Sequence, residues 1–217
     1  MNSESAEALA EVLAVLAAER EITRVLHRYC HAVDRHDMQE LLSVYHPDAA
    51  DEHGSYAGDA KGFVAYMDER MPRVYQATMH VLSNISIDLR GDVAFTESYV
   101  TASHLIRPEL GGGLFWFAGR YIDRFEKRSG EWRIAHRKLL RSWEKVEPAA
   151  RVLDGGVALP DPSPHTDGLR TREDLSYARG CGGRGLRPGH LSRARSQPKS
   201  SPRIIRTGLY SITTSRC

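Results

Sequence analysis

The sequence predicts an α+β fold in which helices pack on one face of a curved, mainly antiparallel sheet that encloses a pocket. Two patterns in the chain support this prediction. Apolar residues recur with helical spacing up to about residue 71, and from about residue 79 to 146 they alternate with polar residues as in strands. Helices followed by a meander of long strands are typical of the α+β class, with the helices on one face of the sheet.

The first element is predicted over residues 4–35, as one long helix or as two helices joined near Arg20. Proline then marks the ends of two shorter helices, because it lacks the amide N–H that a helical turn needs. These helices are predicted over 38–45, before Pro47, and over 59–71, before Pro72, and a short strand is predicted within 49–56.

Four long antiparallel strands account for the rest of the predicted domain, over residues 79–89, 93–106, 114–126 and 131–146. Alternation in the first strand places His80, Leu82, Asn84 and Ser86 on one face and Val81, Ile85, Ile87 and Leu89 on the other. Aromatic residues alternate along the third strand and favour a core or subunit contact: Phe115, Phe117, Tyr121 and Phe125.

The predicted domain covers residues 1–150, and residues 151–217 form an extension rich in Pro, Gly and Arg that we expect to be largely disordered from about residue 165. Residues 165–217 carry 11 basic and 3 acidic side chains, a net charge of +8, which leaves the body near −6. An acidic body gives no reason to propose a nucleic acid partner; a nucleic-acid adaptor acting through the basic tail is the lesser alternative.

The sequence also argues against several classes of protein. It has no apolar run long enough for a membrane span and no secretory signal pattern, so a cytoplasmic location is expected. Its cysteines, Cys30, Cys181 and Cys217, are odd in number and lack the spacing of a disulfide framework or a zinc site. We therefore expect reduced thiols and no metal, and no nucleotide-binding motif is visible.

Two residues are the first candidates for chemistry. Asp34 ends an apolar helical face and is either a solvated helix-end residue or a buried carboxylate that needs a hydrogen-bonding partner. His80 either caps the start of a strand or acts as a base near neutral pH, oriented by a carboxylate on its second ring nitrogen. Asp34 is the expected partner. We predict an acid–base pair from these two side chains.

Two further residues lie on predicted strands. Arg141 shares a face with Leu139 and Trp143 and either presents a cation to a ligand or covers apolar surface with its stem. His104 is a weaker candidate of the same kind.

Together, these residues resemble the SnoaL-like branch of the nuclear transport factor 2-like superfamily over about residues 15–150. The resemblance depends on the order of the elements and on three short patterns: Tyr29-x-x-x-x-Asp34, Thr-Met-His at His80, and the Gly-x-Trp-Arg-Ile strand at 130–134. Members of this type include scytalone dehydratase, hexachlorocyclohexane dehydrochlorinase and bile acid 7α-dehydratase.

The resemblance implies a lyase without a cofactor, most simply a dehydratase, that eliminates water from a small cyclic or steroid-like substrate through Asp34 and His80. It implies catalytic roles for Tyr29 and Arg141 and places His53 and Tyr56 in the substrate-binding region, to which we also assign His104. It also implies a homo-oligomer, a trimer or a dimer. An isomerase, a polyketide cyclase and a ligand-binding or subunit-type protein without catalysis remain the alternatives, because a fold does not determine a function.

Overall fold

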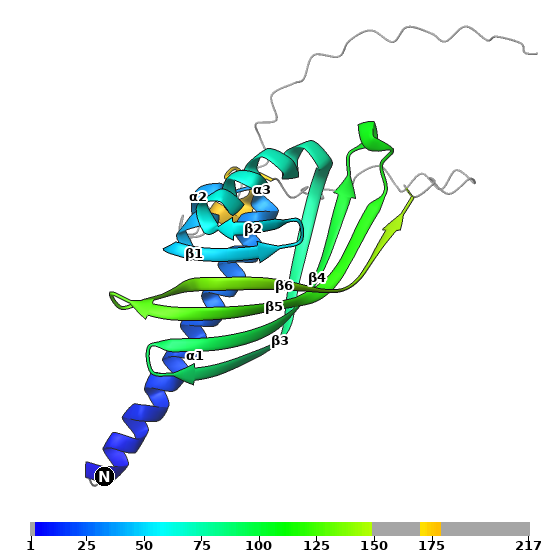
Figure 1. Ribbon diagram of the computed structural model, residues 1–217. Coiled ribbons are helices and arrows are strands. Elements are labelled where there is room, and N and C mark those ends of the chain that lie inside the picture. Colours follow the sequence, from blue (N-terminus) through cyan, green and yellow to red (C-terminus); the bar gives the residue numbers. More distant parts are fainter. Residues whose placement is uncertain (1–2, 149–169, 179–217) are drawn as a thin grey trace, which may run out of the picture. The chain divides into compact units, whose positions relative to one another are not determined.

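The computed structural model describes residues 3–148 and 170–178, which all belong to one unit, Met1–Arg179. Within these residues three α-helices pack on a six-stranded sheet (Figure 1). The helices are α1 (Ser3–Arg35), α2 (Met38–Ser43) and α3 (Ala60–Val74). The strands are β1 (Tyr45–His53), β2 (Tyr56–Asp59), β3 (Tyr75–Arg90), β4 (Val93–Ile106), β5 (Leu114–Arg128) and β6 (Glu131–Glu147). Short 3₁₀ turns lie at Pro108–Leu110 and Leu175–Ala178.

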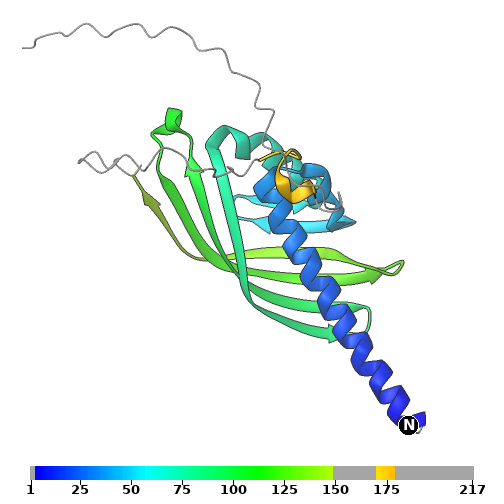
Figure 2. The ribbon, with the colours of Figure 1, turned by 180° about the vertical axis from the view of Figure 1, so that it is seen from behind.

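The sheet has the strand order β2-β1-β6-β5-β4-β3. Strands β3 to β6 form the predicted antiparallel meander, and β1 joins its β6 edge in parallel while pairing with β2 as a hairpin. Helix α1 crosses one face of this curved sheet (Figure 2). The predicted α+β fold, with helices on a curved and mainly antiparallel sheet, is therefore confirmed.

A glycine on β5 lets the long strands bend. The register of β5 and β6 shifts between Ala118 and Gly119. A Cβ atom at Gly119 would lie 2.3 Å from the carbonyl oxygen of Leu140, so a side chain at this position would collide with the neighbouring strand. Glycine at a register shift is a common device for curving a sheet, and here the curvature opens space beneath the helices.

Helix α1 is continuous, without a break near Arg20. Its buried residues lie between Ala18 and Val33, whereas the side chains from residue 3 to 17 are exposed. This exposed half extends beyond the sheet (Figures 1 and 2). The helix stops at Arg35, because His36 takes a left-handed conformation with φ of 53°. Asp34 is thus presented at the last turn, where α1 meets the sheet.

Two predicted helix ends were wrong. Helix α3 continues through Pro72 to Val74, because a proline in the final turn removes only one backbone bond and the Tyr75 amide still donates to the Met71 carbonyl. Helix α2 ends at Ser43 and not at residue 45, since the chain there joins the sheet. Pro47 lies within β1, where the register with β6 is irregular.

The predicted faces of β3 were correct only in part. His80 and Leu82 face inward as a pair, but Asn84 has φ of 47° at a shift in register with β4. This bulge exchanges the two faces, so that Ile85, Ile87 and Leu89 also point to the interior. Val81 is exposed on the opposite face. Simple alternation could not reveal the inserted residue.

The alternating aromatic residues of β5 face inward. Phe125 is part of the core, and Phe115, Phe117 and Tyr121 line a pocket. This strand face is therefore not available for a contact between subunits. Exposed apolar side chains lie elsewhere on the sheet, at Met79, Val81, Phe95, Tyr99 and Trp143.

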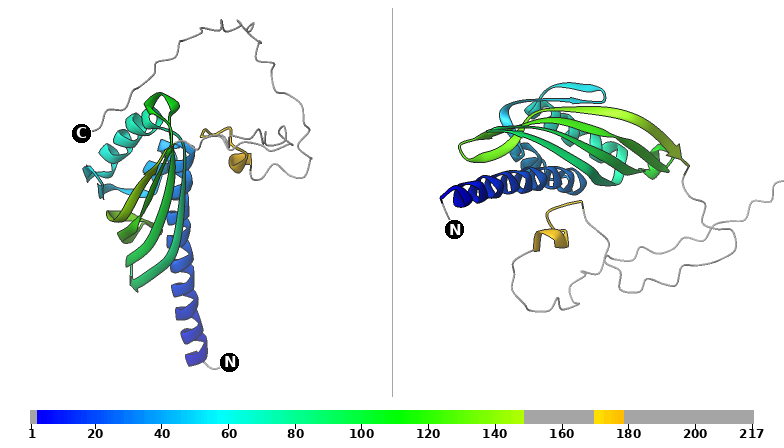
Figure 3. Two further views of the ribbon diagram at one scale, coloured as in Figure 1. Left: turned by 90° about the vertical axis from the view of Figure 1, so that its right-hand side faces the viewer. Right: turned by 90° about the horizontal axis from the view of Figure 1, so that it is seen from below.

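The domain boundary expected near residue 150 and the disorder expected beyond 165 fall mostly outside the described residues, which omit 149–169 and 179–217. Residues 170–178 are described and lie against the C-terminal end of α1 (Figure 3). No helix in the described part of the chain has a stretch apolar enough to cross a lipid bilayer.

Candidate active site

Asp34 and His80 are in direct contact. The Nδ1 atom of His80 lies 2.7 Å from Oδ1 of Asp34. The same carboxylate accepts hydrogen bonds from the His80 backbone amide at 2.9 Å and from the Thr78 hydroxyl at 2.9 Å. Three donors fix the carboxylate, which in turn holds the imidazole ring in one orientation with Nδ1 toward Asp34. The second ring nitrogen, Nε2, is left available to the pocket that His80 lines.

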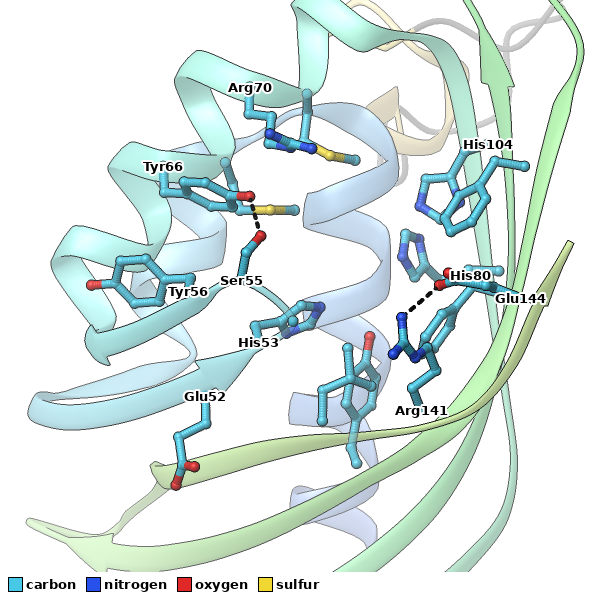
Figure 4. A pocket seen from close by; sticks show the side chains of 18 of the residues that line it. Glu52, His53, Ser55, Tyr56, Tyr66, Arg70, His80, His104, Arg141 and Glu144 are labelled. Carbon is cyan, nitrogen blue, oxygen red and sulfur yellow. Dashed lines mark hydrogen bonds and ion pairs between the residues drawn. The ribbon is translucent and has the colours of Figure 1, made fainter. Parts of the chain in front are cut away.

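The pocket has a volume of about 740 Å³ and lies between α3, the β1–β2 hairpin and the inner face of β3–β6 (Figure 4). This volume falls in the range that binds small organic molecules, roughly 300–1,000 Å³. Its walls combine apolar and aromatic side chains with a few charged ones. Convergent polar groups in an otherwise apolar cavity are typical of an enzyme site for a small substrate.

Four other predicted site residues also line this pocket: His53, Tyr56, His104 and Arg141. Arg141 is largely exposed, and its guanidinium lies 3.1 Å from the Glu144 carboxylate. The Tyr56 hydroxyl donates to the Asp59 carbonyl at 2.7 Å. The structure therefore brings five of the seven predicted side chains to the wall of one cavity, and Asp34 contacts one of these five, His80.

His104 lies beside the acid–base pair. Its ring meets the His80 ring edge-on, with centroids 5.3 Å apart, and contacts the Tyr75 ring at 4.7 Å. Burial, together with the neighbouring His80, lowers the pKa of His104 to about 3. His104 is thus neutral at ordinary pH and shapes the pocket wall without adding charge.

The SnoaL-like domain model matches residues 14–138, more than half of the chain. The protein belongs to the SnoaL-like family. No curated protein matches the sequence.

Solved structures share the fold of this SnoaL-like protein. A hexachlorocyclohexane dehydrochlorinase of type 2 is 18% identical with a TM-score of 0.59, covering 67% of this chain and 99% of that one. A scytalone dehydratase-like protein from Novosphingobium aromaticivorans is 23% identical with a TM-score of 0.54, covering 63% and 95%. A type 3 dehydrochlorinase from Novosphingobium barchaimii is 16% identical with a TM-score of 0.58, covering 64% and 95%. At these identities the likeness shows the fold.

Tyr29 lies apart from the pocket of this SnoaL-like domain. Its side chain is 1% exposed and packs edge-on against the rings of Tyr45 and Tyr121. Burial raises the pKa of its hydroxyl, and the charge of Arg137 only partly opposes this effect. The five-residue separation from Asp34 explains the different position, because it turns the two side chains to different sides of α1.

Sequence reasoning missed a fully buried ion pair beneath the pocket. Arg137 donates two hydrogen bonds of 2.7 Å to Asp123, and its guanidinium carbon lies 4.0 Å from the ring centroids of both Tyr29 and Tyr121. Thr78 was also missed. Its position two residues before His80, on the same face of the strand, was the available signal.

A segment beyond the SnoaL-like match also contacts the site region. Arg172 forms an ion pair of 2.9 Å with Asp37, and the Tyr177 hydroxyl donates to the same carboxylate at 3.0 Å. Burial acts to raise the pKa of Asp37, but these hydrogen bonds and that from the Glu40 amide lower it. Arg170 donates to the Tyr75 carbonyl at 3.2 Å. Burial lowers the pKa of Arg170, and the negative charge of Asp34 opposes this effect. Sequence composition gave no sign of these contacts.

No group of three His, Cys, Asp or Glu side chains within residues 3–148 and 170–178 is arranged to hold a metal ion. Cys30, the one cysteine among these residues, is buried, and burial raises the pKa of its thiol to about 12. A thiol with so high a pKa is a poor nucleophile at neutral pH.

Proposed function

We propose that this protein is a cofactor-independent lyase that eliminates water from a small cyclic or steroid-like substrate. The observation that carries the proposal is the 2.7 Å contact between Asp34 and His80 at a pocket of about 740 Å³. Solved structures of the same fold include dehydrochlorinases and a scytalone dehydratase-like protein, whose names describe elimination reactions. Such a reaction needs a base held beside an apolar cavity, and the pair provides one.

In this proposal the Nε2 atom of His80 removes a proton from a carbon next to an electron-withdrawing group. Asp34 keeps the ring oriented and stabilises the imidazolium that forms. Arg141 stabilises the oxyanion. Its guanidinium would leave the Glu144 carboxylate and bind the substrate oxygen on which negative charge develops. The electron pair left on carbon forms the double bond as the hydroxyl group departs.

A direct test uses the purified protein with a panel of hydroxylated steroids and cyclic β-hydroxyketones, followed by mass spectrometry for the loss of water. We expect turnover by the unchanged protein. The rate of His80→Ala should be reduced by a factor of at least about 100, because general base catalysis typically contributes 10²–10⁴-fold. Arg90→Met is the matched control, since Arg90 is exposed and pairs with Asp88 at the far end of β3.

The same experiment separates the alternatives. Movement of a double bond or a proton without loss of mass indicates an isomerase, and ring closure indicates a cyclase. Ligands that raise the unfolding temperature equally in both proteins, with no product, favour a binding protein and would refute the lyase proposal.

We also propose that the protein is a homo-oligomer, a trimer or a dimer. The exposed apolar side chains on the sheet, Met79, Val81, Phe95, Tyr99 and Trp143, support a contact through this face. Light scattering of the full chain should give a mass two or three times that of the monomer. Replacing both Val81 and Tyr99 with lysine should shift the mass toward the monomer, and a monomeric mass for the unchanged protein would refute the proposal.

A further inference from the structure

We propose that His53 and Asp51 form a second proton-transfer pair in the pocket, in which His53 gives a proton to the leaving hydroxyl of the substrate. This inference rests on the proposed elimination. A hydroxide ion is a poor leaving group, so elimination of water needs an acid at the oxygen as well as a base at the carbon. Tyr29, for which the resemblance implied a catalytic role, is buried away from the pocket.

The pair has a defined geometry. Nδ1 of His53 lies 3.5 Å from Oδ1 of Asp51, and the Asp51 side chain is 0% exposed. The other carboxylate oxygen accepts a hydrogen bond of 2.5 Å from the Tyr45 hydroxyl. Among the described residues neither His53 Nδ1 nor Asp51 Oδ1 has a hydrogen-bond partner, so each atom faces the other as its available partner. A small shortening on substrate binding would complete the bond.

Packing holds the His53 ring in place. It stacks on Phe63 with centroids 4.9 Å apart and an interplanar angle of 29°, and it contacts the Tyr121 ring at 5.8 Å. The ring lines the pocket, so Nε2 is the nitrogen left for a ligand when Nδ1 faces Asp51. Figure 4 shows His53 on the β1 side of the pocket and His80 on the opposite wall.

The carboxylate next to His53 lies among buried charges. Asp51 stands opposite Arg137 in the backbone register of β1 and β6, and Asp123 stands opposite Arg137 in the register of β5 and β6. The bidentate hydrogen bonds of the guanidinium go to Asp123. Among the described residues, Oδ1 of Asp51 is left without a hydrogen-bond donor. A buried carboxylate oxygen without a donor is costly, and an Nδ1–H group on His53 would provide one.

The Asp34–His80 pair has different surroundings. The Asp34 carboxylate already accepts three hydrogen bonds, and the charge of Arg170 interacts with it. The contact of His80 with Asp34 is already complete, whereas the contact of His53 with Asp51 is still long, and the two rings lie on opposite walls of the pocket. We therefore assign the base to His80 and the acid to His53. Other charged side chains also line the pocket: Glu52, Arg70, Lys138, Arg141 and Glu144.

The proposed step is balanced. Nε2 of His80 takes a proton from carbon, the C–H electron pair becomes the double bond, and the C–O bond breaks. His53 transfers its Nε2 proton to the departing oxygen, and water is released. His80 ends protonated and His53 neutral, so one proton must return from His80 to His53 through solvent before the next turnover.

The first experiment needs no substrate. The protonation of the His53 ring is followed with pH by ¹⁵N–¹H NMR in the unchanged protein, in Asp51→Asn and in Tyr45→Phe. We expect the titration midpoint of the His53 ring to move to lower pH by at least about one unit in Asp51→Asn, because the carboxylate that stabilises the imidazolium is gone. Tyr45→Phe should move it up, because Asp51 loses a competing donor. Identical curves in all three proteins would overturn the proposal.

The second experiment uses a substrate that the unchanged protein dehydrates. In deuterated water, His53→Gln should dehydrate this substrate more slowly by a factor of at least about 100. It should still exchange the substrate hydrogen that His80 removes for deuterium. His80→Ala should lose both activities. His46→Gln is the matched control, since His46 lies on the same strand, bonds the Glu126 carbonyl at 2.8 Å and does not line the pocket.

The outcomes distinguish the two proposals. Unchanged dehydration by His53→Gln would overturn the role of His53 and leave the lyase proposal standing. Loss of both dehydration and exchange in a folded His53→Gln protein would show a general binding defect and would also overturn it. If the unchanged protein dehydrates nothing, the lyase proposal fails, and the NMR midpoints alone decide whether Asp51 and His53 form a proton-sharing pair.

Discussion

Two contacts of the domain join a carboxylate to a basic side chain in different surroundings. The buried pair, Arg137–Asp123, is 0% exposed on both sides and lies between two tyrosine rings. The pocket pair, Asp34–His80, has an equally short contact, but one side of the imidazole faces a cavity. The buried pair therefore can only organise the core, whereas the pocket pair can exchange a proton with a ligand. Access to the cavity, more than the strength of the contact, separates the two.

The largest expected effect on stability is in the buried pair. Arg137→Met should lower the free energy of unfolding by about 3–5 kcal/mol, because Asp123 would stay buried without its cation. Urea denaturation measures this loss. The double variant Arg137→Met/Asp123→Leu should recover part of it, since both charges are then removed. A single variant as stable as the unchanged protein would contradict the structural role of the pair.

The pocket pair should respond mainly in activity. Asp34→Asn should reduce dehydration about 100-fold or more, because an amide cannot stabilise the His80 imidazolium. The cost in unfolding free energy should be smaller than for Arg137→Met, about 1–3 kcal/mol, from the disturbed hydrogen bonds to Thr78 and His80. Steady-state rates and urea denaturation of the same sample test both parts. A larger loss of stability than in Arg137→Met would remove the distinction between the pairs.

Acid should affect the pocket side of the domain through His104. Burial lowers the pKa of His104 to about 3, below its usual value near 6.5, so the unfolded chain binds an extra proton between these values. Stability should therefore fall as pH drops below about 6.5, with His104 contributing up to about 1.4 kcal/mol per pH unit. His104→Phe should show a flatter dependence in unfolding experiments from pH 7 to 5. An unchanged slope would contradict the burial of this ring.

The smallest expected effect concerns the contacts that residues 170–178 make with Asp37. Tyr177→Phe removes one hydrogen bond to Asp37 and should leave the midpoint of thermal unfolding nearly unchanged. Limited proteolysis near this segment should nevertheless become faster, because its attachment to Asp37, the residue that caps the start of α2, weakens. Arg90→Met is the matched control with no expected change in cleavage. Equal cleavage rates in Tyr177→Phe and the unchanged protein would show that the hydroxyl does not fasten the segment.

Local patterns were enough to predict the helices and the strand meander, because periodicity records which side of each element is buried. It also pointed to Asp34 and His80, since a carboxylate at the end of an apolar helix and a histidine entering a strand are visible in a linear chain. These predictions depend on local patterns and on one resemblance.

The other features of the site depend on contacts between distant parts of the chain. The parallel pairing of β1 with β6 brings Asp51 beside Arg137, two residues 86 positions apart, and no local pattern encodes such a contact. The bulge at Asn84 reverses the faces of β3, and the packing of Tyr29 under Tyr121 removes it from the pocket. Neither feature can be read from the alternation of residues along the chain. Which polar side chains reach the cavity is therefore fixed by non-local packing, and only the folded chain shows it.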